Sequence, residues 1–277
     1  DGIELRNALL VGDGSPESMG VIRICAELIA NGVDDDVEEW ATDPATLIDD
    51  GNAWEEDDVA LYAEALLELF LHNLGGGSHS LPVVLPLVET LLADNEWKHR
   101  RAALSILERC LSAAPVTFAR HVPVAMETAL SLATNDSVRV QYQAMNLLGA
   151  LCEIDGTLGG VMKVRHQYGP RVLQAIAHSV QSPCTKVASM ACLCIVSYCR
   201  GGGQSSGDGE TLVVPYLKDI LMALVTGPLS LEIMSGASVN IGAIAVKVRA
   251  IGAVACLAES SGESFLPYYG NVMPGLL

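Results

Sequence analysis

The sequence has no lysine or arginine between Asp34 and Asp58, a stretch that holds twelve carboxylates. Across all 277 residues, 16 lysines and arginines stand against 33 acidic residues, and the formal net charge is −17. Outside this stretch the chain is only mildly acidic, with 21 acids against 16 bases. Phosphate backbones and anionic membrane surfaces are bound mainly through lysine and arginine. This charge balance therefore argues against nucleic acid and membrane partners and favours basic proteins.

Catalytic and metal-binding motifs are also missing. Neither glycine-rich stretch, NLGGGSHS or CRGGGQSSGDGE, contains the Gly-Lys-Ser/Thr of a phosphate-binding loop, no HExxH or GxSxG occurs, and the six histidines are scattered. The eight cysteines form no CxxC pair and fall mostly in apolar helical stretches, which indicates reduced core thiols in a cytosolic or nuclear compartment. We therefore expect no enzyme activity, no cofactor and no metal, and we interpret the glycine-rich stretches as connectors.

An uninterrupted run of membrane-spanning length is absent as well. The longest apolar stretch, IGAIAVKVRAIGAVACLAE, is interrupted by Lys247 and Arg249, and no secretory signal is present. We expect a soluble protein in which this stretch is a buried helix. The chain begins at Asp1 without methionine and ends in the apolar NVMPGLL, which suggests a piece of a longer chain.

Internal repeats are the main positive signal. Four stretches share a cation near the start, small residues in the middle and apolar residues at three-and-four spacing: EWKHRRAALSILERCL, DSVRVQYQAMNLLGALCE, CTKVASMACLCIVSYC and VKVRAIGAVACLAES. This is the pattern of an amphipathic helix with a close-packing face. Each is followed by a second apolar helix with a proline near its start, where the missing N–H has no intrahelical acceptor. The chain is thus expected to consist of pairs of a first helix and a second helix.

The prolines of the second helices recur at intervals of 41, 47, 45 and 52 residues: Pro82, Pro123, Pro170, Pro215 and Pro267. These intervals are close to the roughly 40 to 47 residues of HEAT and armadillo repeats, and the last one contains an insertion, LSLEIMSGASVNIG. No segment alternates as a strand would. We predict an all-α fold, an α-solenoid of HEAT repeats, with a partial repeat in 1–32, an acidic inter-repeat insert in 33–58 and about five repeats in 59–277.

Polar residues occupy equivalent positions on the second helices. Counting four residues on from each proline, and one turn further on the first such helix, gives what we call the polar ladder: Glu89, Glu127, Gln174, Asp219 and Asn271. Stacked repeats bring equivalent positions side by side at about 10 Å. Carboxylates and amides at such intervals suit an extended peptide that carries lysines, although an ordinary solvated face has the same pattern. By contrast, Glu64, Glu68 and Glu108 on first helices are expected to face outward.

Several stretches carry a family resemblance. DDDVEEWATDP, WEEDDVALYAEALLEL, NEWKHRRAALSILERC, NDSVRVQYQAMNLLGALC and SFLPYYGNVMPGLL resemble the middle HEAT repeats of the importin β-3 branch of the karyopherin-β nuclear transport receptors. The similarity extends from about residue 33 to the end. Asp136, Val138 and Arg139 match the general start of a HEAT helix, whereas NEWKHR and SPCTKV depart from it because they lack the aspartate.

The resemblance implies a fragment of a nuclear import receptor that shuttles between cytoplasm and nucleus. Such a receptor binds basic, lysine-rich nuclear localisation segments of cargo, binds nucleoporin FG segments, and releases cargo when Ran-GTP binds, mainly to repeats outside this fragment. The cargo-binding role maps onto Glu89, Glu127, Asp219 and Asn271, and Gln174 is a neutral departure.

The same resemblance implies that the acidic insert attracts basic cargo or Ran. Its candidate residues are Asp34, Asp35, Asp36, Glu38, Glu39, Glu55, Glu56, Asp57 and Asp58. Trp40 and Trp54 are expected to hold the insert against the helices.

Two other classes remain open on the sequence. One is a non-catalytic HEAT scaffold of the phosphatase-regulatory kind, whose acidic face keeps an assembly soluble. The other is a chaperone for basic proteins such as histones or ribosomal proteins. Loss of cargo on addition of Ran-GTP to the full-length protein would distinguish a transport receptor from both.

Overall fold

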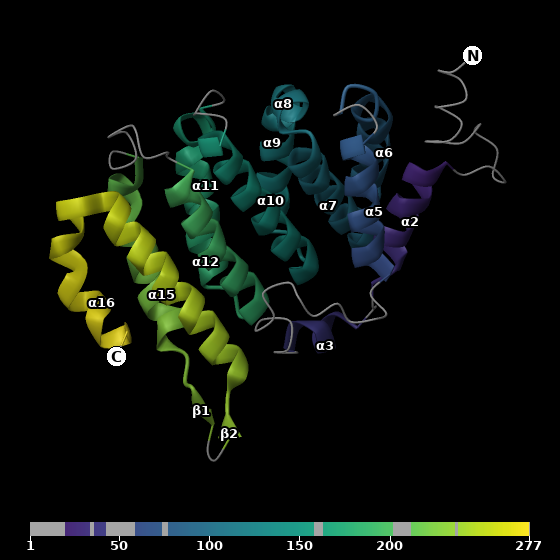
Figure 1. Ribbon diagram of the computed structural model, residues 1–277. Helices are drawn as coiled ribbons and strands as arrows, with labels where there is room; N and C mark the ends of the chain where they lie inside the picture. The colour runs from purple at the N-terminus through teal and green to yellow at the C-terminus, as the bar shows by residue number, and fades with distance from the viewer. Residues whose placement is uncertain are drawn as a thin grey trace. The chain divides into compact units, whose positions relative to one another are not determined.

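The computed structural model describes residues 20–33, 36–42, 59–73, 77–157, 163–201, 212–235 and 238–276. They form two compact units, each of which is described by itself. Unit 1 comprises the described residues in 20–33 and 59–125, and unit 2 comprises 36–42 and those from 126 to 276. The division falls inside α9 (Val122–Leu132), after Ala125. Both units are built from helices (Figure 1).

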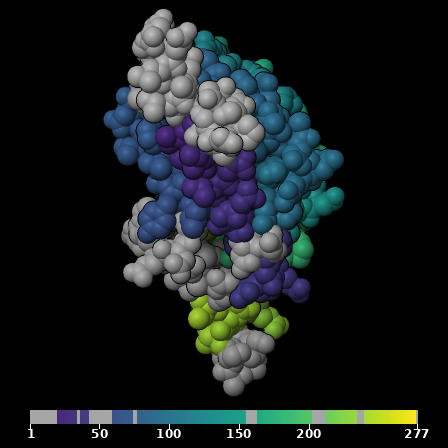
Figure 2. Space-filling model, turned by 90° about the vertical axis from the view of Figure 1, so that its right-hand side faces the viewer, coloured from purple at the N-terminus to yellow at the C-terminus, as the bar shows by residue number. Residues whose placement is uncertain are grey.

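Unit 1 is a small helical stack. Its elements are α2 (Val21–Asn31), α5 (Val59–Asn73), α6 (Leu81–Ala93), α7 (Trp97–Ala113), α8 (Pro115–Phe118), η1 (Ala119–His121) and the start of α9. Helix α2 packs on α5 and α7, and α7 packs on both α5 and α6. Figure 2 shows α2, in purple, at the surface of this unit. Its inner face buries Ile22, Cys25 and Ile29 at the three-and-four spacing that the sequence predicts.

Unit 2 contains the larger stack. Its elements are α3 (Val37–Thr42), the rest of α9, α10 (Val138–Thr157), α11 (Val164–Val180), α12 (Thr185–Arg200), η2 (Val214–Tyr216), α14 (Leu217–Thr226), η3 (Pro228–Ser230), β1 (Met234–Ser235), β2 (Ser238–Val239), α15 (Ile241–Ser261), η4 (Gly262–Tyr268) and α16 (Tyr269–Leu276). The first helices α10, α12 and α15 pack one on the next (Figure 1). Among the second helices, α11 packs on α10, α12 and α14, and α16 contacts α14.

The first helices of unit 2 pack closely because small residues line their contacts. A Cβ at Gly149 on α10 would lie 3.6 Å from the Cα of Cys194 on α12, an ordinary van der Waals contact. Ala144, Leu148 and Leu151 recur at three-and-four spacing and are fully buried. The core of this unit therefore follows the apolar periodicity that predicts the helices.

The all-α class is confirmed, with two local differences. Pro170 was expected in a first helical turn but lies inside α11, which begins six residues earlier at Val164. The extra turn buries Val164 and Tyr168, which offsets the backbone hydrogen bond that a proline cannot donate. In the insertion after α14, Met234–Ser235 pairs antiparallel with Ser238–Val239, a two-residue pairing that leaves the all-α class unchanged.

The apolar stretch at the end of the chain forms helices. By length and composition alone, the segment Ile241–Gly275 is apolar enough to cross a membrane, a property that core helices of soluble proteins share. In unit 2, α15 packs on α12, and its buried residues include Val246, Ala250, Ala253 and Leu257.

The eight cysteines are free, as expected, and six of them are buried. Burial raises the pKa of Cys110 and of Cys192 to about 12, so that both thiols stay protonated at neutral pH. Cys199 and Cys256 are only partly buried.

Candidate functional site

The polar ladder lies on second helices, and all five of its residues are exposed. Glu89 is on α6 in unit 1. In unit 2, the other members occupy α9, α11, α14 and α16, one residue on each helix: Glu127, Gln174, Asp219 and Asn271. These positions are accessible to a partner, and that they act together on one ligand remains a prediction.

Contacts between consecutive second helices of unit 2 show that these helices are neighbours. Arg171 on α11 bonds Glu127 on α9, and the side-chain amide of Gln181, just after α11, lies 3.4 Å from the hydroxyl of Thr226 at the end of α14. Helix α14 in turn contacts α16. The four ladder residues of this unit therefore belong to successive neighbouring helices, as the repeat spacing predicts.

The contact between Glu127 and Arg171 is a bidentate ion pair. The guanidinium donates from Nη1 to Oε1 at 2.6 Å and from Nη2 to Oε2 at 2.8 Å, and both side chains are 54% exposed. These hydrogen bonds and the nearby positive charge hold the pKa of Glu127 below its ordinary value. Arg171 is not among the site residues predicted from the sequence, although it lies three residues before Gln174 and so on the same helical face.

An apolar side chain accompanies one of the acidic ladder positions. Met222 lies one turn after Asp219 on α14 and is 46% exposed. A lysine that reached the carboxylate of Asp219 could lay its methylene chain along this thioether. The surface therefore offers both an acceptor and an apolar contact for a long basic side chain.

Part of the acidic insert is helical. Asp36 caps α3, because its Oδ1 accepts a hydrogen bond of 2.8 Å from the backbone N–H of Glu39. Glu38 and Glu39 lie in the first helical turn, where carboxylates are favoured. The candidate residues Asp34, Asp35, Glu55, Glu56, Asp57 and Asp58, together with Trp54, lie outside the described residues.

Trp40 holds α3 against the first turns of α10 and α12, as expected for this tryptophan. Its ring meets Tyr142 edge-on, with ring centroids 5.5 Å apart and planes at 85°. The Cζ of Arg139 lies 5.0 Å from the Trp40 centroid and the Nζ of Lys186 lies 4.5 Å from it. We call these four residues the Trp40 cluster. Because Arg139 is 6% and Lys186 2% exposed, the indole ring provides a stabilising aromatic face for two buried cations.

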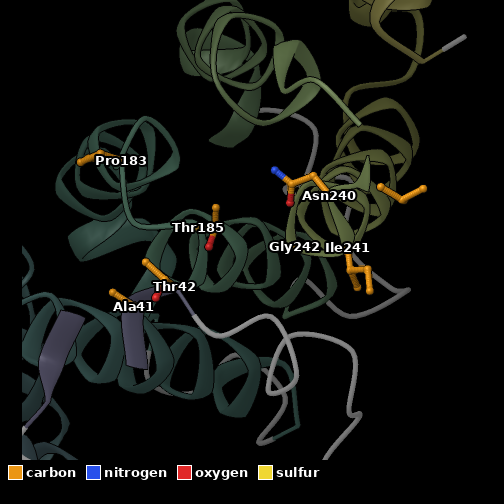
Figure 3. Close-up of a pocket in the computed structure, with 8 residues that line it drawn as sticks. Ala41, Thr42, Pro183, Thr185, Asn240, Ile241 and Gly242 are labelled. Atoms are coloured by element: carbon orange, nitrogen blue, oxygen red, sulfur yellow. The ribbon is translucent and has the colours of Figure 1, made fainter. Parts of the chain in front are cut away.

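A pocket of about 370 Å³ lies beside the end of α3 in unit 2 (Figure 3). Its described lining comes from α3, the region where α12 begins and the region where α15 begins: Ala41, Thr42, Pro183, Thr185, Val239, Asn240, Ile241 and Gly242. Asn240 is already engaged as the cap of α15, since its Oδ1 accepts from the N–H of Ala243 at 3.0 Å. None of these eight residues is titratable, and within the described residues no three His, Cys, Asp or Glu side chains are grouped to hold a metal ion.

The expectation that Glu64, Glu68 and Glu108 face outward is wrong. In unit 1 they surround Arg109, which lies 3.1 Å from Glu64, 3.1 Å from Glu68 and 3.3 Å from Glu108. Glu64 is only 8% exposed. Burial raises the pKa of Glu108, with smaller upward contributions from the other two carboxylates and an opposing one from Arg109. These acids are part of the contact between α5 and α7.

Comparison with known proteins bears on this architecture. No model of a known protein family matches the sequence. The chain is 24% identical over 246 residues to importin subunit beta-3 of Saccharomyces cerevisiae, covering 88% of this chain and 20% of that protein. It matches the structure of Kap121p bound to Pho4p with a TM-score of 0.72 and 21% identity, covering 92% of this chain and 22% of that one. The match to Kap121p bound to RanGTP has the same TM-score and identity, and covers 92% of this chain and 23% of that one.

The structural matches define the class, which is the HEAT-repeat fold of the karyopherins. Within that class, the sequence match is to an importin β-3, which confirms the resemblance drawn from the sequence stretches. The chain spans about a fifth of the length of this relative.

Proposed function

We propose that this chain is the cargo-binding part of a nuclear import receptor and that it holds basic, lysine-rich localisation segments on its second helices. The observation that carries the proposal is the exposure of one polar residue on each of four successive second helices in unit 2. The likeness to importin subunit beta-3 and to Kap121p supports the same reading. An extended peptide with lysines at intervals has the charge and the shape to contact such a row.

The acidic insert has a separate role in this proposal. Its carboxylates attract a basic segment over a distance and raise the rate of encounter, whereas the polar ladder makes the short contacts. The Trp40 cluster supports this division, because it fixes α3 on the first helices α10 and α12 of unit 2.

The wider activity follows from the same proposal. A receptor of this class shuttles between cytoplasm and nucleus, contacts nucleoporins and releases cargo to Ran-GTP, and one of the similar structures is a complex of Kap121p with RanGTP. We assign Ran-GTP binding mainly to parts of the full-length protein outside this chain. No catalytic step, cofactor, nucleic acid or membrane contact is part of the proposed function.

The proposal is tested by titrating the chain against a fluorescent peptide that carries several lysines, with anisotropy read at about 0.15 M salt. A peptide of the same length with glutamines in place of the lysines is the control. We expect binding of the lysine peptide only, and equal binding of both would contradict the proposal. In the full-length protein, Ran-GTP should displace the lysine peptide, whereas a scaffold or a chaperone for basic proteins should keep it.

A further inference from the structure

One ladder position differs chemically from its neighbours because it already holds a cation. Both oxygens of the Glu127 carboxylate accept hydrogen bonds from Arg171, at 2.6 Å and 2.8 Å. The two residues come from successive second helices of unit 2 and both are 54% exposed. Within the described part of the chain, Asp219 has no comparable ion-pair partner.

The ion pair changes what Glu127 can offer to a ligand. A carboxylate that faces a guanidinium with both oxygens has its charge neutralised, and the guanidinium is itself a positive charge at the position where a lysine would arrive. An ammonium group would have to displace Arg171 or approach beside it. The guanidinium is favoured in that competition because its planar fork matches the carboxylate, whereas an ammonium is a point charge with strong hydration.

We propose that Arg171 is a specificity-determining residue that occupies Glu127 as an internal competitor of cargo lysines. This inference rests on the proposed function, since it presupposes that the second helices bind a basic segment. As a consequence, Glu127 is not available as an acceptor for cargo. A bound segment therefore gains most of its binding free energy from lysines that reach Gln174, Asp219 and Asn271. Removal of Arg171 should then open the Glu127 position and strengthen binding, although most changes at a binding surface weaken it.

The expected size of the effect follows from the exposure of the pair. An exposed ion pair changes a binding constant by a few-fold, and a bidentate pair lies at the upper end of that range. The substitution Arg171→Gln should therefore tighten binding of the lysine peptide by about twofold to tenfold. Adding Glu127→Gln to this substitution should abolish the gain, because the carboxylate that was released is no longer present.

The experiment compares these variants by fluorescence anisotropy with the lysine peptide at about 0.15 M salt. Arg200→Gln is the matched control, since Arg200 is an exposed arginine on a first helix of unit 2 and its loss makes the same change in net charge. Tighter binding by Arg171→Gln alone, with no gain in the double variant, supports the proposal. Equal tightening by Arg200→Gln would overturn it, because the effect would then reflect net charge.

Failure of this inference can be separated from failure of the proposed function. If Arg171→Gln leaves the affinity unchanged while Asp219→Asn weakens binding, the ladder binds the peptide and Arg171 is no competitor. If the unchanged chain does not bind the lysine peptide, both proposals are overturned. Thermal unfolding of each variant verifies that the helices are intact, which the exposure of both side chains leads us to expect.

Discussion

The ammonium nitrogen of Lys186 lies 4.5 Å from the centroid of the Trp40 ring, although the two residues are far apart in the sequence. Lys186 is the second residue of α12, and only 2% of its surface is exposed. Arg139, the second residue of α10, lies against the same ring. Two of the cations that recur near the starts of first helices, Arg139 and Lys186, thus hold α3, the described helix of the acidic insert.

The Trp40 cluster predicts a clear stability effect. The substitution Trp40→Ala removes the aromatic face from two buried cations and should lower the free energy of unfolding of unit 2 by about 2 to 3 kcal/mol. Trp40→Phe keeps a smaller ring and should lose about half as much. Urea denaturation followed by circular dichroism measures both losses. Equal stability of the alanine variant and the unchanged chain would show that α3 is not held by this contact.

The acidic insert should act on the rate of association. Replacement of its candidate carboxylates by asparagine or glutamine, with Asp36 kept because it caps α3, should slow association with the lysine peptide. The dependence of that rate on salt should become flatter, since long-range attraction is screened by salt. Stopped-flow anisotropy at about 0.05 M and about 0.3 M salt measures both effects. An unchanged rate at low salt would mean that the insert is only a solvated connector.

The partly buried carboxyl group of Glu108 predicts a dependence of stability on pH. Because burial raises its pKa above the ordinary value, the folded chain binds this proton more tightly than the unfolded chain does. The resulting stabilisation is complete below the ordinary pKa and is lost as pH rises through the folded-state pKa. At pH 7 the substitution Glu108→Gln should therefore raise the melting temperature of unit 1, and this gain should shrink towards pH 4.

Glu68→Gln is the control for that measurement. Glu68 also bonds Arg109, at 3.1 Å, but its side chain is 33% exposed, whereas that of Glu108 is 15% exposed. Its substitution should give no gain at pH 7. A loss of stability at pH 7 in Glu108→Gln would mean that the contact with Arg109 outweighs the cost of burial.

Two helical glycines of unit 2 predict opposite effects of the same substitution. A Cβ at Gly169 would lie 2.7 Å from the hydroxyl of Tyr198, which is 1% exposed, so Gly169→Ala should cost about 1 to 3 kcal/mol. At Gly149 the nearest atom would be 3.6 Å away, and the higher helix propensity of alanine should add up to about 1 kcal/mol. Urea denaturation of both variants tests this pair. A stable Gly169→Ala variant would show that Tyr198 can move aside.

The sequence predicts the parts of this structure that depend on local periodicity. The first and second helices follow from three-and-four apolar spacing, and the core thiols follow from the cysteines within it. Contacts between residues about one repeat apart were not predicted, because a sequence pattern does not reveal which charged side chains meet. Arg171 with Glu127 and Arg109 with Glu64 are both of this kind, and each changed the interpretation of an acidic residue. Pro170 shows that a proline does not always mark the first turn of a helix, because the residues before it can form an additional turn that is buried.

The central claim is that the polar ladder binds a basic segment, and one comparison tests it most directly. Joint replacement of Glu89, Glu127, Asp219 and Asn271 by alanine removes three acids. Replacement of Glu232, Glu259 and Glu263, which are exposed and lie outside the ladder, makes the same change in net charge. Each variant is titrated with the lysine peptide at about 0.15 M salt by calorimetry.

Each exposed contact contributes only about 0.2 to 1 kcal/mol of binding free energy. Loss of Glu127 also leaves the positive charge of Arg171 facing the basic peptide. Together, these changes should cost the ladder variant about 2 to 4 kcal/mol of binding free energy. That loss corresponds to a decrease in affinity of about thirty-fold to nearly a thousand-fold. The control variant should change the affinity by less than about threefold. If both variants weaken the peptide equally, attraction is only global and the second helices are not the binding site.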